Sequence, residues 1–350
     1  MPGSDILPKV TIVMPVLNEG QFIEQTLEQL VSQDYPRQCI EILVVDGGST
    51  DDTHDIVNKM SGKHLYVKLL DNPKKRSSAG RNIGFREGQG EYFVVIDGHC
   101  YIPDDQLIKN IVKFFQKSGA DCLGRPQQLD PPGLTDFQKA VAVARASKIG
   151  HSGASLIYSD FEGFISPQSN GAAYKKEVFD EVGYVDESFD AAEDLEFNYR
   201  VEKAGLKCYT GSALTVKYYP RISLSALFRQ LSRYGQGRRR FIHKHPEAIS
   251  FNQLIPFFFV LGLGLAIPAL LSVPLKGELL SLPALLISPY FLYAGVIFFF
   301  SMYIAGQNTW GYIFVLPVIF FVIHFSLGWG FLKESIIFLR YPKAVNYERI

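Results

Sequence analysis

The sequence predicts an α/β protein in which a Rossmann-like domain with a largely parallel sheet precedes an α-helical transmembrane domain. Three observations predict this class. Short β-branched runs alternate with amphipathic helical stretches over the first two-thirds of the chain, as in α/β domains. Acidic turns follow several of these runs. Three apolar runs, 254–274, 284–305 and 311–332, each approach the roughly 20 residues that span a bilayer core.

The individual elements follow from composition and spacing. Residues 10–16 are apolar and rich in β-branched side chains, and the apolar residues of 22–31 recur at helical spacing. The same succession of strand, turn and helix returns from residue 40 onward. The predicted strands cover residues 10–16, 40–45, 65–70 and 92–96, and the predicted helices cover 22–31, 53–60 and 195–203.

The balance of charge and the use of cysteine narrow the class of protein. The 350 residues carry 35 basic and 35 acidic side chains, so the basic excess typical of nucleic-acid binders is missing and we expect no nucleic acid as a partner. Four scattered cysteines without a Cys-x-x-Cys pair indicate reduced thiols. The N-terminal residues lack the pattern of a signal peptide, which predicts a cytoplasmic location for the first domain.

Polar side chains collect where three of the predicted strands end. Asn18 and Glu19 follow the first strand, segment 46–52 follows the second, and Asp97 with His99 follows the fourth. The carboxyl ends of parallel strands share one edge of a sheet, so these turns should form one ligand site. A well-capped strand-to-helix loop would explain each turn alone. Three acidic turns on one edge favour a ligand.

Asp97-Gly98-His99 suggests a metal site. A carboxylate and an imidazole two residues apart, just past a buried strand, can reach one divalent ion that bridges the diphosphate of a bound donor. Oxygen ligands with one imidazole suit Mn²⁺ and tolerate Mg²⁺. The alternative is a simple turn.

Glu193 and Asp194 open the predicted helix at 195–203. Carboxylates at a helix start can be caps. The functional interpretation makes Asp194 the general base that takes a proton from an acceptor hydroxyl. Between this pair and the metal motif, Asn170 and Gly171 lie in a stretch of small residues that could line a sugar pocket or form a turn.

Residues 223–250 form a basic amphipathic segment before the apolar runs. The pattern is that of an interfacial helix that binds anionic headgroups. Alternatively, Arg238, Arg239 and Arg240 contact the diphosphate of a lipid-linked acceptor. Basic residues also follow the last run, and the positive-inside rule then puts both flanks in the cytoplasm. We therefore predict two or three spans within 251–335, the two-span case making one run re-entrant or interfacial, and a tail at 336–350.

Together these residues resemble glycosyltransferase family 2, an inverting family with the A-type glycosyltransferase fold. The segment Val13-Met-Pro-Val-Leu-Asn-Glu19 resembles the family's opening strand and nucleotide-contacting loop. Val44–Asp51 resembles the family's second strand and turn. This implies that Asp46 binds the nucleobase of the donor nucleotide. Ala79-Gly-Arg-Asn82 resembles the segment before the metal motif, which implies that Arg81 meets the donor. The positions that we assign to the nucleotide and donor are Pro15, Val16, Asn18, Glu19, Asp46, Gly48, Ser49, Asp51, Arg81, Asp97 and Gly98.

Two further motifs depart from the common family pattern. Asp97-Gly-His-Cys100 replaces the usual Asp-x-Asp and is similar to the form found in bacterial succinoglycan-type transferases. Gln230-Leu-Ser-Arg-Tyr234 is similar to the Gln-x-x-Arg-Trp motif of processive synthases, with tyrosine in place of tryptophan. Glu193-Asp194 matches the family's acidic pair, whose Asp is the base. The positions that we assign to the acceptor or its diphosphate are Asn170, Gly171, Gln230, Arg233, Tyr234, Arg238, Arg239 and Arg240.

The resemblance implies an integral membrane glycosyltransferase with a cytoplasmic catalytic domain at 1–222. It would move a sugar from a nucleotide diphosphate sugar, such as a UDP-sugar, to a membrane-associated, lipid-linked acceptor in polysaccharide or glycolipid synthesis. Three alternatives stay open at this point: a processive synthase, a nucleotidyltransferase, and a membrane assembly subunit that binds a nucleotide sugar without turnover. A nucleotidyltransferase would need basic residues at the first turn, where Asn18, Glu19 and Gln21 stand.

Overall fold

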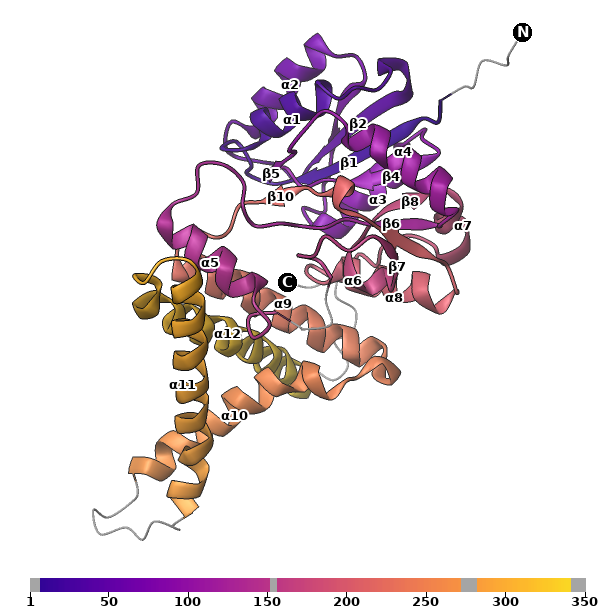
Figure 1. Cartoon of the computed structure of the whole chain (residues 1–350). Helices are drawn as coiled ribbons and strands as arrows, with labels where there is room; N and C mark the ends of the chain where they lie inside the picture. Colours follow the sequence, from indigo (N-terminus) through magenta and orange to yellow (C-terminus); the bar gives the residue numbers. More distant parts are fainter. Residues whose placement is uncertain (1–6, 152–155, 272–281, 341–350) are drawn as a thin grey trace. The chain divides into compact units, whose positions relative to one another are not determined.

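A computed structural model describes residues 7–151, 156–271 and 282–340. The chain divides into two compact units (Figure 1). The first contains Met1–Pro132 and Ala154–Tyr219, and the second contains Gly133–Gly153 and Pro220–Ile350. Residues 133–153 lie inside the segment 1–222 that the sequence predicts as one domain, yet they pack with the helical unit.

The first unit is built on one twisted, mixed sheet of order β3-β2-β1-β4-β8-β6-β9-β7. Strands β1 to β4, β6 and β9 run in one direction, whereas β8 and β7 run in the opposite direction. The sheet is therefore largely parallel, as predicted. The strands are β1 (Val10–Val16), β2 (Ile40–Asp46), β3 (Val67–Asp71), β4 (Tyr92–Val95), β6 (Cys122–Gly124), β7 (Gly163–Ile165), β8 (Gly171–Lys175) and β9 (Cys208–Thr210), with β5 (Cys100–Tyr101) and β10 (Lys217–Tyr218) forming a separate antiparallel pair.

Strand alternation gives the sheet two apolar faces, each covered by its own helices. Ile12 and Met14 on β1 belong to one core cluster with α1, α2 and α4, whereas Val13 belongs to another with α3, α7 and α8. These helices are α1 (Ile23–Val31), α2 (Thr53–Lys63), α3 (Ser77–Glu87), α4 (Leu107–Ser118), α7 (Glu177–Val182) and α8 (Glu193–Lys203), with a short α6 (Pro167–Asn170) before β8. The layered arrangement brings the loops of the parallel strands to one edge.

The predicted strand limits are confirmed for β1 and are shifted for β3. The sequence predicts a strand at 65–70, but β3 begins at Val67. Leu65 is 91% exposed and lies before the strand. The predicted strand began too early because Leu65 is apolar, although this residue does not take part in the sheet.

The second unit is helical. Three of its helices are long and apolar enough to cross a membrane, judged by length and composition, over Phe251–Pro268, Leu285–Gln307 and Tyr312–Arg340. The last helix continues past the predicted limit at 335. The charged residues Lys276 and Glu278, and residues 341–350 of the predicted tail, lie outside the described residues. The helices of this unit are α5 (Asp136–Ala146), α9 (Leu224–Lys244), α10 (Phe251–Leu271), α11 (Leu282–Gln307) and α12 (Tyr312–Arg340).

Helix α9, the basic segment of the sequence, packs closely on α12. A Cβ atom added to Gly235 would lie 2.1 Å from the carbonyl oxygen of Leu327, and one added to Gly330 would lie 1.9 Å from that of Ser232. Such approach is possible only for glycine. Leu227 of α9 is also fully buried in a core shared with α5 and α12. The segment is thus a packed element of the helical unit.

Candidate active site

The first two loops of the sheet edge are bonded to each other. Asp46 is buried at the end of β2 and accepts hydrogen bonds from the backbone N–H of Ser49 and from its hydroxyl, the latter at 2.6 Å. The backbone N–H of Asn18 donates to the Ser49 hydroxyl at 2.8 Å, and the Asn18 side chain accepts from the N–H of Thr50 at 2.8 Å. These contacts fix the turn that the sequence assigns to the nucleotide, with Gly48 at φ 80° in the left-handed region.

Asp51 joins the same two loops. Its carboxylate accepts from the Thr53 hydroxyl at 2.6 Å and from the Gly20 N–H at 2.9 Å. The hydrogen bond from Thr53 is the main cause that lowers the pKa of Asp51. The structure therefore gives Asp51 the loop-capping role considered as the alternative, and its contact with a donor stays a prediction.

The third loop carries Asp97 and His99 after β4. His99 Nδ1 lies 2.8 Å from Glu19 Oε1 of the first loop. Gly98 permits this approach, because an added Cβ would lie 3.0 Å from the Glu19 side chain and 3.1 Å from that of Val16. A carboxylate that holds one ring nitrogen of a histidine orients the other nitrogen as a ligand.

Asp97 is half-buried and surrounded by cationic groups. Burial raises the pKa of this carboxyl, but His99, Arg81 and Arg125 together bring the pKa below its ordinary value. Within the described residues, no group of three or more His, Cys, Asp or Glu side chains is suited to a metal ion. The donor set is thus one ionised carboxylate and one oriented imidazole, which fits a divalent ion whose other ligands are diphosphate oxygens and water.

Arg81, on α3, reaches across to the acidic pair. Its Nη2 atom lies 3.3 Å from Glu193 Oε1, and its side chain is 14% exposed. Burial lowers the pKa of this guanidinium, but Glu193, Asp194 and Asp97 raise it above its ordinary value. Its Nε atom is buried without a hydrogen-bond partner. This buried, unsatisfied N–H of a guanidinium is suited to an acceptor atom of a ligand, such as a diphosphate oxygen.

The two members of the acidic pair have different environments. Glu193 is buried, and desolvation and Asp194 raise its pKa while Arg81 lowers it, with a net rise. Asp194 is exposed in the first turn of α8, where it accepts a hydrogen bond from the N–H of Leu195 at 2.8 Å. Ala192, just before the pair, has φ 61°, an uncommon left-handed conformation for a residue with a side chain. Asp194 is thus the member that can meet an incoming hydroxyl.

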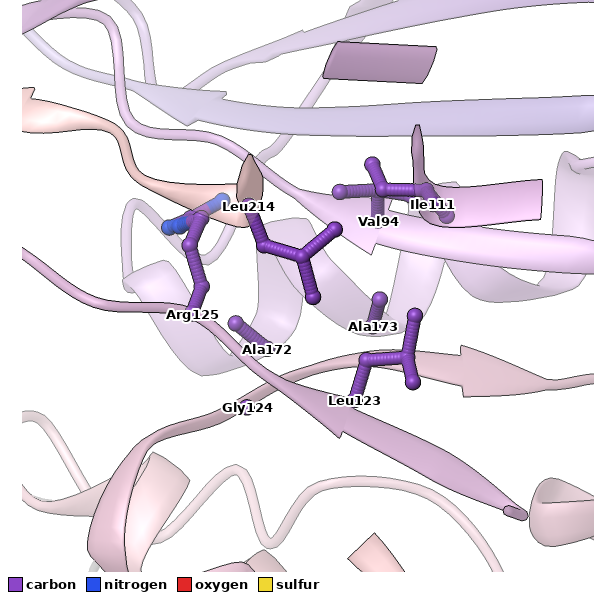
Figure 2. A pocket seen from close by; sticks show the side chains of 8 residues that line it. All are labelled: Val94, Ile111, Leu123, Gly124, Arg125, Ala172, Ala173 and Leu214. Atoms are coloured by element: carbon purple, nitrogen blue, oxygen red, sulfur yellow. The ribbon is translucent and has the colours of Figure 1, made fainter. Parts of the chain in front are cut away.

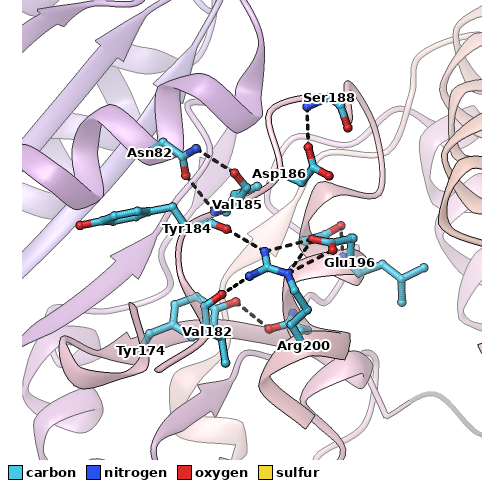
Figure 3. A network of polar contacts seen from close by, with 12 residues as sticks. Asn82, Tyr174, Val182, Tyr184, Val185, Asp186, Ser188, Glu196 and Arg200 are labelled. Carbon is cyan, nitrogen blue, oxygen red and sulfur yellow. Dashed lines mark hydrogen bonds and ion pairs between the residues drawn. The ribbon is translucent and has the colours of Figure 1, made fainter. Parts of the chain in front are cut away.

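A polar network behind the pair holds α3 and α8 in place (Figure 3). Asn82, next to Arg81, donates to the carbonyl of Val185 at 2.8 Å and accepts from its N–H at 3.0 Å. On α8, Arg200 donates to the buried carboxylate of Glu196 at 3.0 Å and to the Tyr184 carbonyl at 2.7 Å. Segment 182–187 therefore links the helix of Arg81 to the helix of Asp194.

Arg125 and Tyr218 are site residues that sequence reasoning missed. Arg125 is 5% exposed, donates to the Val95 carbonyl, and donates from Nη2 to the Tyr218 hydroxyl at 2.8 Å. Tyr218 is also one of the groups that lower the pKa of Asp97. Figure 2 shows Arg125 at the margin of a small, mainly apolar cavity beside Leu214 and Val94. Arg125 directly follows β6, so the strand-end rule would have found it if β6 had been predicted.

Asn170 and Gly171 lie at the start of β8, which runs antiparallel to β4 and so begins at the edge where β4 ends. Both amide atoms of Asn170 are buried without a hydrogen-bond partner. A Cβ on Gly171 would lie 2.6 Å from the side-chain oxygen of Asn198. The unsatisfied amide suits a polar ligand, and its assignment to an acceptor stays a prediction.

The other predicted acceptor residues belong to α9 of the helical unit. Gln230 Nε2 donates to the Tyr234 hydroxyl at 3.3 Å. Arg240 Nε lies 2.7 Å from Glu334 Oε1, and Arg239 Nε donates to the Ser335 hydroxyl at 3.1 Å. Arg233 and Tyr234 are exposed on the same helix.

Comparison with known proteins decides the family. The family model described as glycosyl transferase family 2 matches residues 11–183. The succinoglycan biosynthesis protein ExoA of Rhizobium meliloti is 36% identical over 247 residues, which cover 70% of this chain and 73% of that protein. The chain belongs to glycosyltransferase family 2. A glycosyltransferase is an enzyme of sugar transfer, so the alternatives of a nucleotidyltransferase and of a subunit without turnover are set aside.

Two further matches extend this family 2 assignment. A Methanococcus voltae protein named dolichyl N-acetyl-alpha-D-glucosaminyl phosphate 3-beta-D-2,3-diacetamido-2,3-dideoxy-beta-D-glucuronosyltransferase is 27% identical over 334 residues, covering 93% of this chain and 97% of that protein. The solved mannosyltransferase PcManGT of Pyrobaculum calidifontis matches with a TM-score of 0.59 at 18% identity, covering 91% of this chain and 88% of that chain. The glycosyltransferase therefore has the A-type fold, and its three apolar helices fit a membrane protein.

Proposed function

We propose that this glycosyltransferase moves a sugar, with inversion, from a nucleotide diphosphate sugar to a lipid-linked acceptor at the cytoplasmic face of a membrane, in polysaccharide or glycolipid synthesis. One observation carries the proposal: Arg81, Asp97 and the pair Glu193–Asp194, distant in sequence, face one another in the first unit. The Methanococcus relative, matched over nearly its whole length, supports the acceptor class, because its name contains a dolichyl phosphate-linked sugar.

In the proposed reaction, Asp194 accepts the proton of the acceptor hydroxyl as that oxygen attacks the anomeric carbon of the donor. The bond from this carbon to the diphosphate breaks, and the nucleoside diphosphate leaves with the electron pair. Attack from the face opposite the leaving group converts an α-linked donor into a β-linked product. Glu193 keeps Arg81 in place and does not exchange the proton itself, because it is buried and ion-paired.

The second requirement of the reaction is to stabilise the negative charge on the leaving diphosphate. The unsatisfied Nε–H of Arg81 offers a charge-assisted hydrogen bond to it. A divalent ion held by Asp97 and His99, with Mn²⁺ or Mg²⁺ suited to this set, would supply further positive charge there. PcManGT, the neighbour with the same fold, was solved in complex with GDP-mannose and Mn²⁺. Arg125 and Tyr218 help to lower the pKa of Asp97, which favours the ionised carboxylate that a metal ion needs.

The test uses the full chain in lipid, a panel of UDP- and GDP-sugars, and two acceptors: a soluble oligosaccharide and the same saccharide linked to a polyprenyl diphosphate. We expect transfer from one donor class, at least tenfold faster to the lipid-linked acceptor, with a β linkage by NMR. Equal rates with both acceptors would reject the lipid-linked acceptor. An α linkage from an α-linked donor would reject the single displacement.

A further inference from the structure

The basic residues of the helical unit fall into two groups with different surroundings. The first group has partners on α12. Arg240 forms an ion pair with Glu334, which is 1% exposed, and the guanidinium of Arg239 lies 4.7 Å from the ring centroid of Phe338. A buried ion pair and a stacked guanidinium serve the packing of α9 on α12.

The second group consists of Arg145, His151 and Arg238, which we call the arginine–histidine cluster. Burial lowers the pKa of Arg238, and only Tyr234 opposes this effect. Burial, together with Arg145 and Arg238, lowers the pKa of His151 to about 4. Across residues 7–151, 156–271 and 282–340, no carboxylate forms an ion pair with either arginine. Both guanidinium groups thus lie near the imidazole of His151, and neither has a counter-charge among the described residues.

Packing holds the cluster together. Ala140 and Ala144 of α5 share a core with Leu227 and Leu231 of α9, which places the end of α5 beside α9. The turn after α5 folds back on the helix, since a Cβ on Gly150 would lie 1.9 Å from the Ala144 carbonyl oxygen. This close return brings His151 next to Arg145.

Two hydrogen bonds fix the turn. The N–H of His151 donates to the Ser147 carbonyl at 3.1 Å. Nε2 of His324 on α12 lies 2.7 Å from the carbonyl oxygen of Ile149. The turn that carries His151 is therefore held by α5 and α12, as a binding group needs to be.

Helix α9 adds polar groups on the side of Arg238. Gln230, Tyr234 and Arg238 are spaced four residues apart and so lie along one face of the helix. The side-chain oxygen of Gln230 is buried without a hydrogen-bond partner. The guanidinium of Arg238 and this oxygen of Gln230 thus lie on the same face of α9.

A buried cation without a counter-charge is unfavourable unless an anion joins it. Arginine side chains bind phosphate oxygens with paired, charge-assisted hydrogen bonds. The cluster also belongs to the unit that carries the apolar helices, and α10 begins at Phe251, shortly after α9 ends at Lys244. An anion that suits this place is the phosphate of a lipid at the membrane surface.

We infer that Arg145, His151 and Arg238 bind the phosphate or diphosphate of an isoprenoid lipid that carries the acceptor. This inference rests on the proposed function and names the part of the acceptor that the helical unit recognises. It also divides the three consecutive arginines of the sequence by role: Arg238 binds the phosphate, whereas Arg239 and Arg240 bind α12.

The experiment measures binding of farnesyl diphosphate to the full chain in detergent by calorimetry, with saturating UDP and Mn²⁺ so that the donor site is filled. We expect Arg145→Gln and Arg238→Gln each to raise the Kd at least tenfold, and His151→Gln to raise it less. Lys148→Gln removes an exposed cation from the same turn and serves as the matched control with unchanged Kd. The Kd for UDP reports on folding in every variant, and His151→Gln carries the test if an arginine variant fails to fold.

The possible outcomes separate the inference from the function on which it rests. Wild-type binding that the arginine variants retain would overturn the inference and leave the proposed function standing. Binding that depends on the cluster, without transfer to a lipid-linked acceptor, would keep the isoprenoid phosphate site but reject its role in holding the acceptor, together with the proposed acceptor. Inorganic pyrophosphate and nanodiscs of phosphatidylglycerol identify other sources: if either competes as well as farnesyl diphosphate, the site recognises phosphate or bulk headgroups and the isoprenoid assignment is overturned.

Discussion

The two units of the molecule differ in whether their charged side chains have partners within the protein. At the sheet edge of the first unit, the carboxylates have partners within the protein. Asp46 and Asp51 accept hydrogen bonds from neighbouring hydroxyls, Glu19 contacts His99, and Glu193 forms an ion pair with Arg81. In the helical unit, Arg145 and Arg238 have no such counter-charge among the described residues. The difference teaches that the first site is preorganised before its ligand binds, whereas the second is completed by its ligand.

The largest effect that separates the two sites should come from metal removal. A chelator should reduce transfer to background, and added Mn²⁺ should restore it, because Asp97 and His99 belong to the first unit only. Farnesyl diphosphate binding, measured without UDP, should remain unchanged in chelator. Full transfer activity in chelator would contradict the metal site. Loss of both transfer and farnesyl diphosphate binding in chelator would mean that the two units do not differ in their need for a metal ion.

The next effect concerns the exposed carboxylate of the acidic pair. Asp194→Asn keeps the shape but removes the proton acceptor, so kcat should fall by roughly two to four orders of magnitude with little change in UDP affinity. Steady-state kinetics and calorimetry on one preparation measure both quantities. Asp180→Asn, an exposed carboxylate on α7, is the matched control. A near-normal kcat would remove Asp194 from the role of base.

A third comparison concerns neighbouring arginines in one helix. Arg240→Gln leaves Glu334 buried without its partner and should lower the free energy of unfolding by about 3 kcal/mol. Arg238→Gln removes a desolvated cation for which residues 7–151, 156–271 and 282–340 supply no counter-charge, and it should leave the stability unchanged or raised. Thermal denaturation of both variants in the same detergent gives the answer. Equal destabilisation would mean that Arg238, too, serves packing.

The smallest effect should come from the network behind the acidic pair. Asn82→Ala leaves the N–H and carbonyl of Val185 without their side-chain partner, which should lower the free energy of unfolding by about 2 kcal/mol. Asn58→Ala, on an exposed face of α2, should change it by less than about 0.5 kcal/mol. Denaturation curves that cannot distinguish these two variants would argue against a supporting role for the network.

The sequence was sufficient where a pattern is local. Strand β1 has its predicted limits because an apolar, β-branched run is bounded by polar residues. Asp97, Arg81 and the acidic pair were found from strand ends and from the family resemblance, and the structure brings them together.

The remaining features depend on neighbours that are distant in sequence. Strand β6 has three residues and no alternating pattern of its own, so it was not predicted, and Arg125 was missed with it. Arg238 and Arg240 are equivalent in composition, but on a helix they point in different directions. Only the position of Glu334 on α12 shows which of them is paired.

The place of β8 in the sheet has a consequence for synthesis of the chain. Strand β4 pairs with β1 on one side and with β8 on the other, although β6 comes between β4 and β8 in the sequence. While the chain leaves the ribosome, β1 to β4 can assemble from neighbouring segments, but the outer edge of β4 has no partner until residue 175 has been made. An open strand edge invites pairing with other chains. We therefore expect a nascent chain that is halted before β8 to be more prone to aggregation than one that includes residues 171–175.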